Sequence, residues 1–196
     1  MKVVFPLDAT LQLVTEQIDL PALAQNQDVY YALLESIVSQ QLSVKAADTI
    51  FKRFLTLFAD NYPKPEALKA LEIEVLRDVG LSRQKAAYLQ AVAEFQLTQG
   101  IDFEILVAKT EDEIIAYLTT IKGVGKWTVE MLLIFVLQRP DVLSVDDLGI
   151  QQGIKRLYKL TAEGKELKKQ MLELGENWRP NRSLACRYLW RWKDNA

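Results

Sequence analysis

Two aspartates and a pair of glycines are the residues of this chain whose types and spacing could do chemistry together. Asp146 and Asp147 come after Pro140, which stops a hydrophobic stretch, and they begin the next helical pattern. A carboxylate at a helix N-terminus is stabilised by the helix dipole and by backbone N–H donors. Such a fixed negative charge suits a reaction in which positive charge develops on the substrate. Either aspartate could instead serve as an N-cap alone.

Gly123 and Gly125 bracket a tight turn earlier in the chain. Glycine tolerates positive φ and lets another backbone or a phosphate approach closely. Gly125 leads into a helix that we expect from Lys126 to Leu137, and the first N–H groups of that helix form an anion site. A Gly-x-Gly turn taken alone is more often structural, so its meaning depends on what surrounds it.

Caps and apolar spacing predict that nearly all of the chain is helical, with no convincing strands. Thr110 and Glu113 form a capping box before the glycine turn. Arg83 and Lys85 could contact phosphate, but we expect them to be solvated at the start of a helix capped by Ser82. The other expected helices lie around Leu11 to Ile18, from Asp28 to Ser39, Val44 to Phe58, Ala67 to Leu71, Glu74 to Val79, Ser82 to Gln96, Asp102 to Ala108, Asp147 to Leu157 and Thr161 to Leu174.

The amino-acid composition limits the kinds of catalytic and metal-binding site that the chain can form. The chain has 196 residues, 49% of them hydrophobic, which is enough for a sizeable core. It has no histidine, so histidine acid–base catalysis and histidine-ligated zinc are excluded. Its single cysteine, Cys186, excludes an internal disulfide and an iron–sulfur cluster held by four thiolates. The net charge of −2 argues against broad electrostatic wrapping of nucleic acid and requires a local patch for any such binding.

No run of 18 apolar residues and no charged-then-apolar leader is present. We therefore expect neither a membrane span nor a secretory signal, and a cytoplasmic protein by default.

Residues 121–128 and 145–149 read IKGVGKWT and VDDLG. Together they closely resemble the signature of the helix-hairpin-helix DNA glycosylases, the HhH-GPD superfamily, and within it the 3-methyladenine DNA glycosylase II (AlkA-like) branch. The elbow SQQLS at residues 39–43 and the C-terminal residues 178–191 match further parts of that family in the right order.

The resemblance implies an all-α, two-lobed helix-hairpin-helix DNA glycosylase fold with the active-site cleft between the lobes. It implies a single domain over residues 1–196, with the helix-hairpin-helix at about residues 110–137 and the N- and C-terminal helices packed together as one lobe. No iron–sulfur cluster and no catalytic metal are expected. A structural Na⁺ or K⁺ on the hairpin carbonyls fits what relatives bind.

The resemblance places the catalytic aspartate at Asp147, with Asp146 as its rival. Trp127, Met131 and Trp190 match positions that line the base pocket. Bifunctional relatives have a lysine where this chain has Trp127, and that lysine cuts the DNA strand through a Schiff base. The resemblance therefore implies a monofunctional enzyme.

The family's DNA contacts fall on two segments of this chain. The elbow matches the loop that fills the gap left by an extruded base, with Gln41 at the wedge and Leu42 as the alternative. The hairpin matches the segment that holds one strand through backbone N–H groups. The residues concerned are Gln40, Gln41, Leu42, Ser43, Gly123, Val124, Gly125, Lys126 and Thr128.

The function so implied is excision of alkylated purines, such as 3-methyladenine and 7-methylguanine, from double-stranded DNA with a flipped base, by a monomer. Such an enzyme would work in the nucleoid of a bacterium or the nucleus of a eukaryote. Two alternatives remain open. One is a glycosylase for a deaminated or oxidised purine, and the other is a non-catalytic helix-hairpin-helix DNA-binding module.

Overall fold

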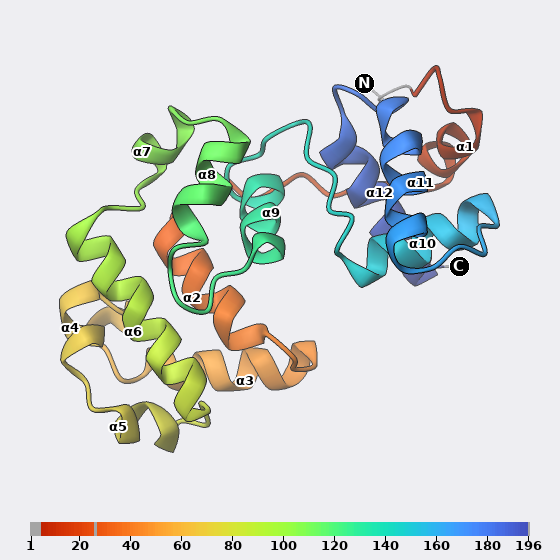
Figure 1. The fold of residues 1–196 in the computed structure, drawn as a ribbon. Helices are drawn as coiled ribbons and strands as arrows, with labels where there is room; N and C mark the ends of the chain where they lie inside the picture. The colour runs from red at the N-terminus through yellow and green to blue at the C-terminus, as the bar shows by residue number, and fades with distance from the viewer. Residues whose placement is uncertain (1–4, 26, 196) are drawn as a thin grey trace. The chain divides into compact units, whose positions relative to one another are not determined.

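A computed structural model of the protein describes residues 5–25 and 27–195 (Figure 1). These residues form α-helices and one short 3-10 helix, and no β-strand occurs among them, which confirms the all-α prediction. The chain divides into two compact units. One contains residues 25–132, and the other combines residues up to 24 with residues 133–196.

The unit formed by residues 25–132 is built around its longest helix, α6. Helix α6 packs against α2, α4 and α5, and α2 also packs against α3. Leu33, Leu34 and Ile37 of α2 are fully buried in this core. The helices are α2 (Val29–Ser39), α3 (Val44–Leu55), η1 (Ala59–Asn61), α4 (Pro65–Ala70), α5 (Ile73–Asp78), α6 (Arg83–Thr98), α7 (Phe103–Val107) and α8 (Glu111–Leu118).

The other unit joins the N-terminal segment to the C-terminal helices. Its helices are α1 (Ala9–Gln17), α10 (Leu148–Tyr158), α11 (Gly164–Glu176) and α12 (Arg182–Asn195). Helix α10 packs on α12 and α11, and α1 packs on α12 and α10. Asp8 caps α1 by accepting the Leu11 N–H, and its second oxygen accepts bonds from Tyr158 and Trp178.

The division between the units falls inside α9 (Lys126–Phe135), so the helix that follows the glycine turn contributes to both. We expected α9 to reach Leu137, but it ends two residues earlier. Gln138 takes a left-handed conformation with φ of 50°, and the Arg139 N–H donates to the Leu133 carbonyl at 2.8 Å. Pro140 indicated that the helix stops nearby, but no glycine marks the exact end.

Helix α3 was predicted to reach Phe58 but ends at Leu55. The chain tightens there into three-residue turns, in which Leu57 and Phe58 donate to the carbonyls of Phe54 and Leu55. The Thr56 hydroxyl supports this turn by donating to the Arg53 carbonyl at 2.7 Å.

Helix α11 begins at Gly164, three residues later than expected, and ends at Glu176.

Within the described part of the chain, no helix combines the length and the apolar character needed to cross a membrane.

Candidate active site and DNA-binding surface

Asp147 is held in place by two donors on one of its carboxylate oxygens. The Oδ1 atom accepts the backbone N–H of Ile150 at 2.7 Å, which makes Asp147 the N-cap of α10. The same atom accepts the indole N–H of Trp190, on α12, at 2.8 Å. Asp147 is only 8% exposed, so its carboxylate is fixed in a largely desolvated place. Positioning of this kind lets a charge act without reorganising during a reaction.

Asp146, the rival, lies in a different environment. Its side chain is 39% exposed and forms an ion pair with Lys168 of α11. A solvated carboxylate paired with a lysine is weakly held and screened by water. The geometry therefore favours Asp147 over Asp146 as the reacting carboxylate.

Trp190 contacts Phe135 with one face of its ring and Gly149 with its edge. Its ring stacks on Phe135, with centroids 5.5 Å apart and planes 29° from parallel. Gly149 lies against its edge, since a Cβ built there would be 2.9 Å from the Cδ1 atom of Trp190 and 3.0 Å from the Oδ1 atom of Asp147. Sequence reasoning gave no role to Phe135 or to Gly149. The position of Phe135, one turn after Met131, was the only signal for it.

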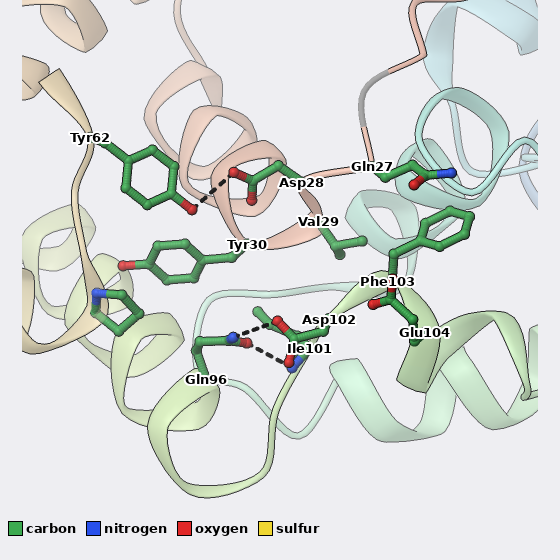
Figure 2. A pocket seen from close by; sticks show the side chains of 11 residues that line it. Gln27, Asp28, Val29, Tyr30, Tyr62, Gln96, Ile101, Asp102, Phe103 and Glu104 are labelled. Atoms are coloured by element: carbon green, nitrogen blue, oxygen red, sulfur yellow. Dashed lines mark hydrogen bonds between the residues drawn. The ribbon is translucent and has the colours of Figure 1, made fainter. Parts of the chain in front are cut away.

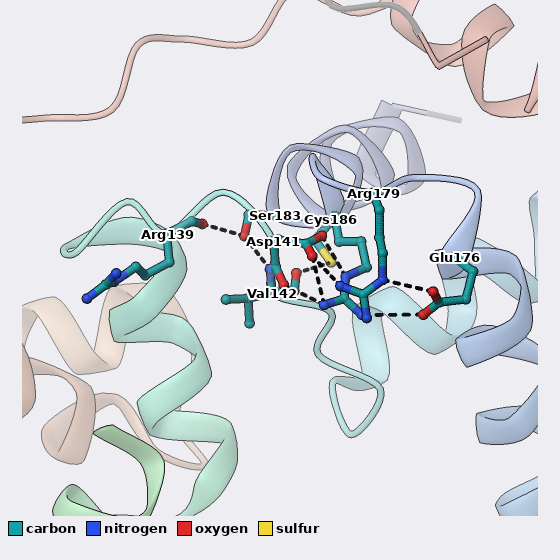
Figure 3. A network of polar contacts seen from close by, with 8 residues as sticks. Arg139, Asp141, Val142, Glu176, Arg179, Ser183 and Cys186 are labelled. Carbon is teal, nitrogen blue, oxygen red and sulfur yellow. Dashed lines mark hydrogen bonds and ion pairs between the residues drawn. The ribbon is translucent and has the colours of Figure 1, made fainter. Parts of the chain in front are cut away.

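The loop that carries Asp147 is tied to the start of α12 (Figure 3). The Asp141 carboxylate is bound by Arg179 and Arg182, and Arg182 also donates to the Asp141 carbonyl at 2.7 Å. Burial alone would raise the pKa of Asp141, but the hydrogen bonds and charges of the two arginines lower it overall. Ser183 accepts the Val142 N–H at 2.9 Å. These contacts fix the start of the segment that leads to Asp147.

The glycine turn before α9 uses its two glycines differently. Gly123 has φ of 94°, and a Cβ there would lie 2.2 Å from the Tyr88 ring. At Gly125, by contrast, an added Cβ would meet open space. The turn therefore needs Gly123 in order to fold, whereas Gly125 leaves room for an external group at the N-terminus of α9.

Helix α9 presents some of its predicted site residues to solvent and buries others. Trp127 is 40% exposed and Met131 is half-buried. The Lys126 ammonium lies on the surface, 3.4 Å from the carboxylate of the buried Glu130. Val124 and Thr128 are buried. We had expected the Thr128 side chain to contact DNA, but because it is buried we do not assign it that contact.

The elbow between α2 and α3 lies beside the glycine turn. Gln40 donates through its side-chain amide to the Gly123 carbonyl at 3.2 Å, so it links the elbow to the hairpin. Gln41 takes a left-handed conformation, with φ of 59°, and both Gln41 and Leu42 are exposed. Ser43 caps α3, as predicted, by accepting the Ala46 N–H. The two wedge candidates thus stand at the tip of the turn.

A pocket of about 270 Å³ lies at the start of α2 (Figure 2). Asp28, Asp102 and Glu104 contribute three carboxylates to its lining, and the Tyr62 hydroxyl donates to Asp28 at 2.9 Å. Burial, followed by the bond to Asp28, raises the pKa of Tyr62 above its usual range. Three carboxylates would repel phosphate. This face is therefore unsuited to DNA, and we assign it a structural role.

The chain belongs to the HhH-GPD superfamily of base excision DNA repair proteins, whose family model matches residues 34–180. DNA-3-methyladenine glycosylase 1 of Schizosaccharomyces pombe is 37% identical to it over 169 residues, which are 85% of this chain and 73% of the relative.

Two glycosylases are among the solved structures that share its fold. The 3-methyladenine DNA glycosylase of S. pombe in complex with abasic DNA superimposes with a TM-score of 0.85 at 34% identity, covering 95% of this chain and 92% of the other. The DNA-3-methyladenine glycosidase of Bacillus halodurans gives a TM-score of 0.80 at 40% identity, covering 93% and 83%.

Proposed function

We propose that the protein is a monofunctional DNA glycosylase that hydrolyses the N-glycosidic bond of alkylated purines in double-stranded DNA and leaves an abasic site. 3-Methyladenine and 7-methylguanine are the substrates we expect. The observation that carries this proposal is the buried Asp147 carboxylate, which is held by a helix N-terminus and by the Trp190 indole. The 3-methyladenine glycosylases among its relatives support the choice of lesion.

Asp147 supplies the negative charge that the reaction needs. Cleavage of an N-glycosidic bond passes through a sugar with oxocarbenium character, and a fixed carboxylate stabilises that cation or orients the attacking water. A base alkylated at N3 or N7 already carries a positive charge, so it leaves without strong general acid assistance. The absence of histidine from the chain is therefore compatible with this chemistry.

Trp127 determines the type of glycosylase in this proposal. A lysine at its position would attack the sugar and lead to strand cleavage. A tryptophan cannot form a Schiff base, and the neighbouring Lys126 forms an ion pair with Glu130 instead. The indole of Trp127 would attract a cationic base through its π-face, and that attraction favours the alkylated base over the normal one.

The enzyme would hold DNA locally, because its net charge is −2. The open space at Gly125 and the first N–H groups of α9 suit a phosphate. Any Na⁺ or K⁺ on the hairpin carbonyls would be structural and take no part in bond cleavage. We expect the protein to act on genomic DNA, in the nucleoid of a bacterium or the nucleus of a eukaryote.

The alternatives differ in what they require. A pure DNA-binding module has no need for a desolvated aspartate joined to a tryptophan, as Asp147 and Trp190 are. A glycosylase for a deaminated or oxidised purine would use the same aspartate but would face a neutral leaving base. Such a base needs a proton donor in order to leave, whereas a cationic alkylated base does not.

The test is release of free base from methylated duplex DNA by the wild type, Asp147→Asn and Asp146→Asn. Asparagine retains the capping geometry, so the Asp147 variant should fold, yet its rate should fall by about 100-fold or more, as when an electrostatic stabiliser is removed. Asp146→Asn should stay within about threefold of wild type, since its carboxylate is a solvated surface group.

DNA strands should break only after alkali in this experiment. Strand breaks before alkali would contradict a monofunctional enzyme. Absence of base release by the wild type, with DNA binding retained, would favour another lesion or a binding module.

A further inference from the structure

The side chain of Lys85, at the start of α6, reaches the elbow between α2 and α3. Its ammonium donates to the carbonyls of Val38 and Gln40, each at 2.7 Å. We expected Lys85 to be solvated, and this expectation is wrong. Arg83, two residues earlier, does lie on the surface, where it pairs with Glu74.

The two carbonyls belong to the last turn of α2 and its C-cap. The final carbonyls of a helix have no partner within it and carry the negative end of its dipole, so an ammonium is well suited to them. Lys85 is half-buried, and burial lowers its pKa. The two carbonyl bonds offset part of that desolvation.

Few side chains pack against the inner side of the elbow that Lys85 contacts. A hollow of about 250 Å³ lies there, between the elbow and the Gly80 turn. Its lining comprises Gln40, Gln41, Leu42, Ile50, Gly80, Leu81, Ser82 and Lys85. Packing therefore contributes little to the position of the Gln41–Leu42 tip. Its position therefore depends on hydrogen bonds. The Leu42 N–H donates to the Ser39 carbonyl and closes the turn, while the bonds from Lys85 and the bond from Gln40 to the Gly123 carbonyl join the turn to α6 and to the hairpin.

We propose that Lys85 is a positioning residue for base extrusion: it fixes the Gln41–Leu42 tip relative to the hairpin before DNA binds. This inference rests on the proposed glycosylase function. A tip that is already ordered costs less to insert into a base stack than one that must first be ordered. Lys85 touches neither the base nor the sugar in this scheme, and it acts through the elbow alone.

The experiment compares Lys85→Met with wild type on two duplexes. In one, 7-methylguanine is paired with cytosine. In the other it stands opposite an abasic-site analogue, so that extrusion needs little help. We expect kcat/KM to fall about 10- to 100-fold on the paired lesion, in line with the loss of two hydrogen bonds to a charged donor. On the unpaired lesion the fall should be less than about threefold, because unpairing no longer limits the reaction.

Arg83→Met is the matched control, because it removes one positive charge from the same turn of α6 without touching the elbow. It should behave like wild type on both duplexes. Equal losses on the paired and unpaired lesions for Lys85→Met would overturn the proposal, as would a loss on the paired lesion that Arg83→Met shares.

A second measurement is independent of catalysis. Amide hydrogen exchange of residues 38–43 should be faster in Lys85→Met than in wild type or Arg83→Met, with thermal stability little changed. Unchanged exchange would mean that Lys85 does not hold the elbow in place and would refute the proposal. If exchange is faster in Lys85→Met but the wild type releases no base, the proposed function is refuted, while the structural role of Lys85 in holding the elbow stands.

Discussion

At Asp147 the observed N-cap and the proposed reacting carboxylate are compatible interpretations of one residue. Capping α10 fixes the position of its Oδ1 atom, and the Trp190 bond to that same atom fixes the orientation of the carboxylate. A carboxylate held from two directions is preorganised for a developing cation. The capping geometry that made Asp147 ambiguous in the sequence therefore serves its proposed chemistry.

Gly149 is the residue that allows this arrangement to close. In Gly149→Ala the new methyl group would stand 2.9 Å from Trp190 and 3.0 Å from Asp147, so the indole must shift away from the carboxylate. We expect single-turnover base release to slow by about tenfold or more, since small displacements of positioned groups are costly. Tryptophan fluorescence should report the moved ring.

Gly153→Ala provides the control on the same helix. Its Cβ would lie 3.4 Å from the Leu189 carbonyl, an ordinary contact, so this variant should keep its activity and gain helix stability. If Gly149→Ala were as active as Gly153→Ala, the Trp190 contact would have no part in positioning Asp147.

The starts of the helices could be read from the sequence because the signals are local. Asp28, Ser43, Ser82 and Thr110 each accept an N–H from three residues further along, as their types and places predict. Thr110 completes the predicted capping box. Helix ends were read less well, because the stop at Phe135 depends on Gln138 adopting a conformation that glutamine rarely takes.

Contacts distant in the chain could not be predicted. Lys85 reaches carbonyls 45 and 47 residues away, and its neighbourhood resembles any solvated helix start. Phe135 meets Trp190 only because α9 and α12 fold together. For Asp147 the sequence supplied the position, while the bond that distinguishes it from Asp146 came from α12.

The glycine turn yields a prediction that separates folding from DNA binding. Gly123→Ala should lower the free energy of unfolding by several kcal/mol or prevent folding, because its methyl group meets the Tyr88 ring at 2.2 Å and φ is positive there. Gly125→Ala should fold normally but bind duplex DNA about tenfold more weakly, since its methyl group occupies space that we assign to a phosphate.

Chemical denaturation measures the stability of Gly123→Ala, and titration with a fluorescent duplex measures the DNA affinity of Gly125→Ala. Normal DNA affinity in Gly125→Ala would place the phosphate elsewhere. A stable, fully helical Gly123→Ala protein would mean that the Tyr88 ring moves aside at little cost.

Across the molecule, buried and half-buried tyrosines connect segments that are distant in the chain. Tyr158 donates to Asp8 at 2.6 Å and so connects α10 to the start of α1. Tyr30 donates to the Pro63 carbonyl at 2.7 Å, and Tyr62 donates to Asp28. Burial is the largest cause that raises the pKa of each, and Asp8 raises that of Tyr158 further.

These shifts predict how stability depends on pH. Each hydroxyl has a higher pKa folded than unfolded, where it is about 10. Its contribution is therefore complete below pH 10 and is lost as the pH rises toward the folded value. Of the seven tyrosines, we expect Tyr30, Tyr62 and Tyr158 to ionise only as helicity is lost, in an absorbance titration at 295 nm followed in parallel by circular dichroism.

Tyr158→Phe tests the link between α10 and the start of α1. It removes one of the hydrogen-bond donors to Asp8 but leaves the ring packed near Trp178, so the protein should be less stable at pH 7 and its stability should fall less steeply above pH 10. Tyr188→Phe supplies a comparison at a tyrosine on α12. If all the tyrosines ionised near pH 10 while the helices stayed intact, the hydroxyls would be reached by solvent in the folded protein and these links would contribute little to its stability.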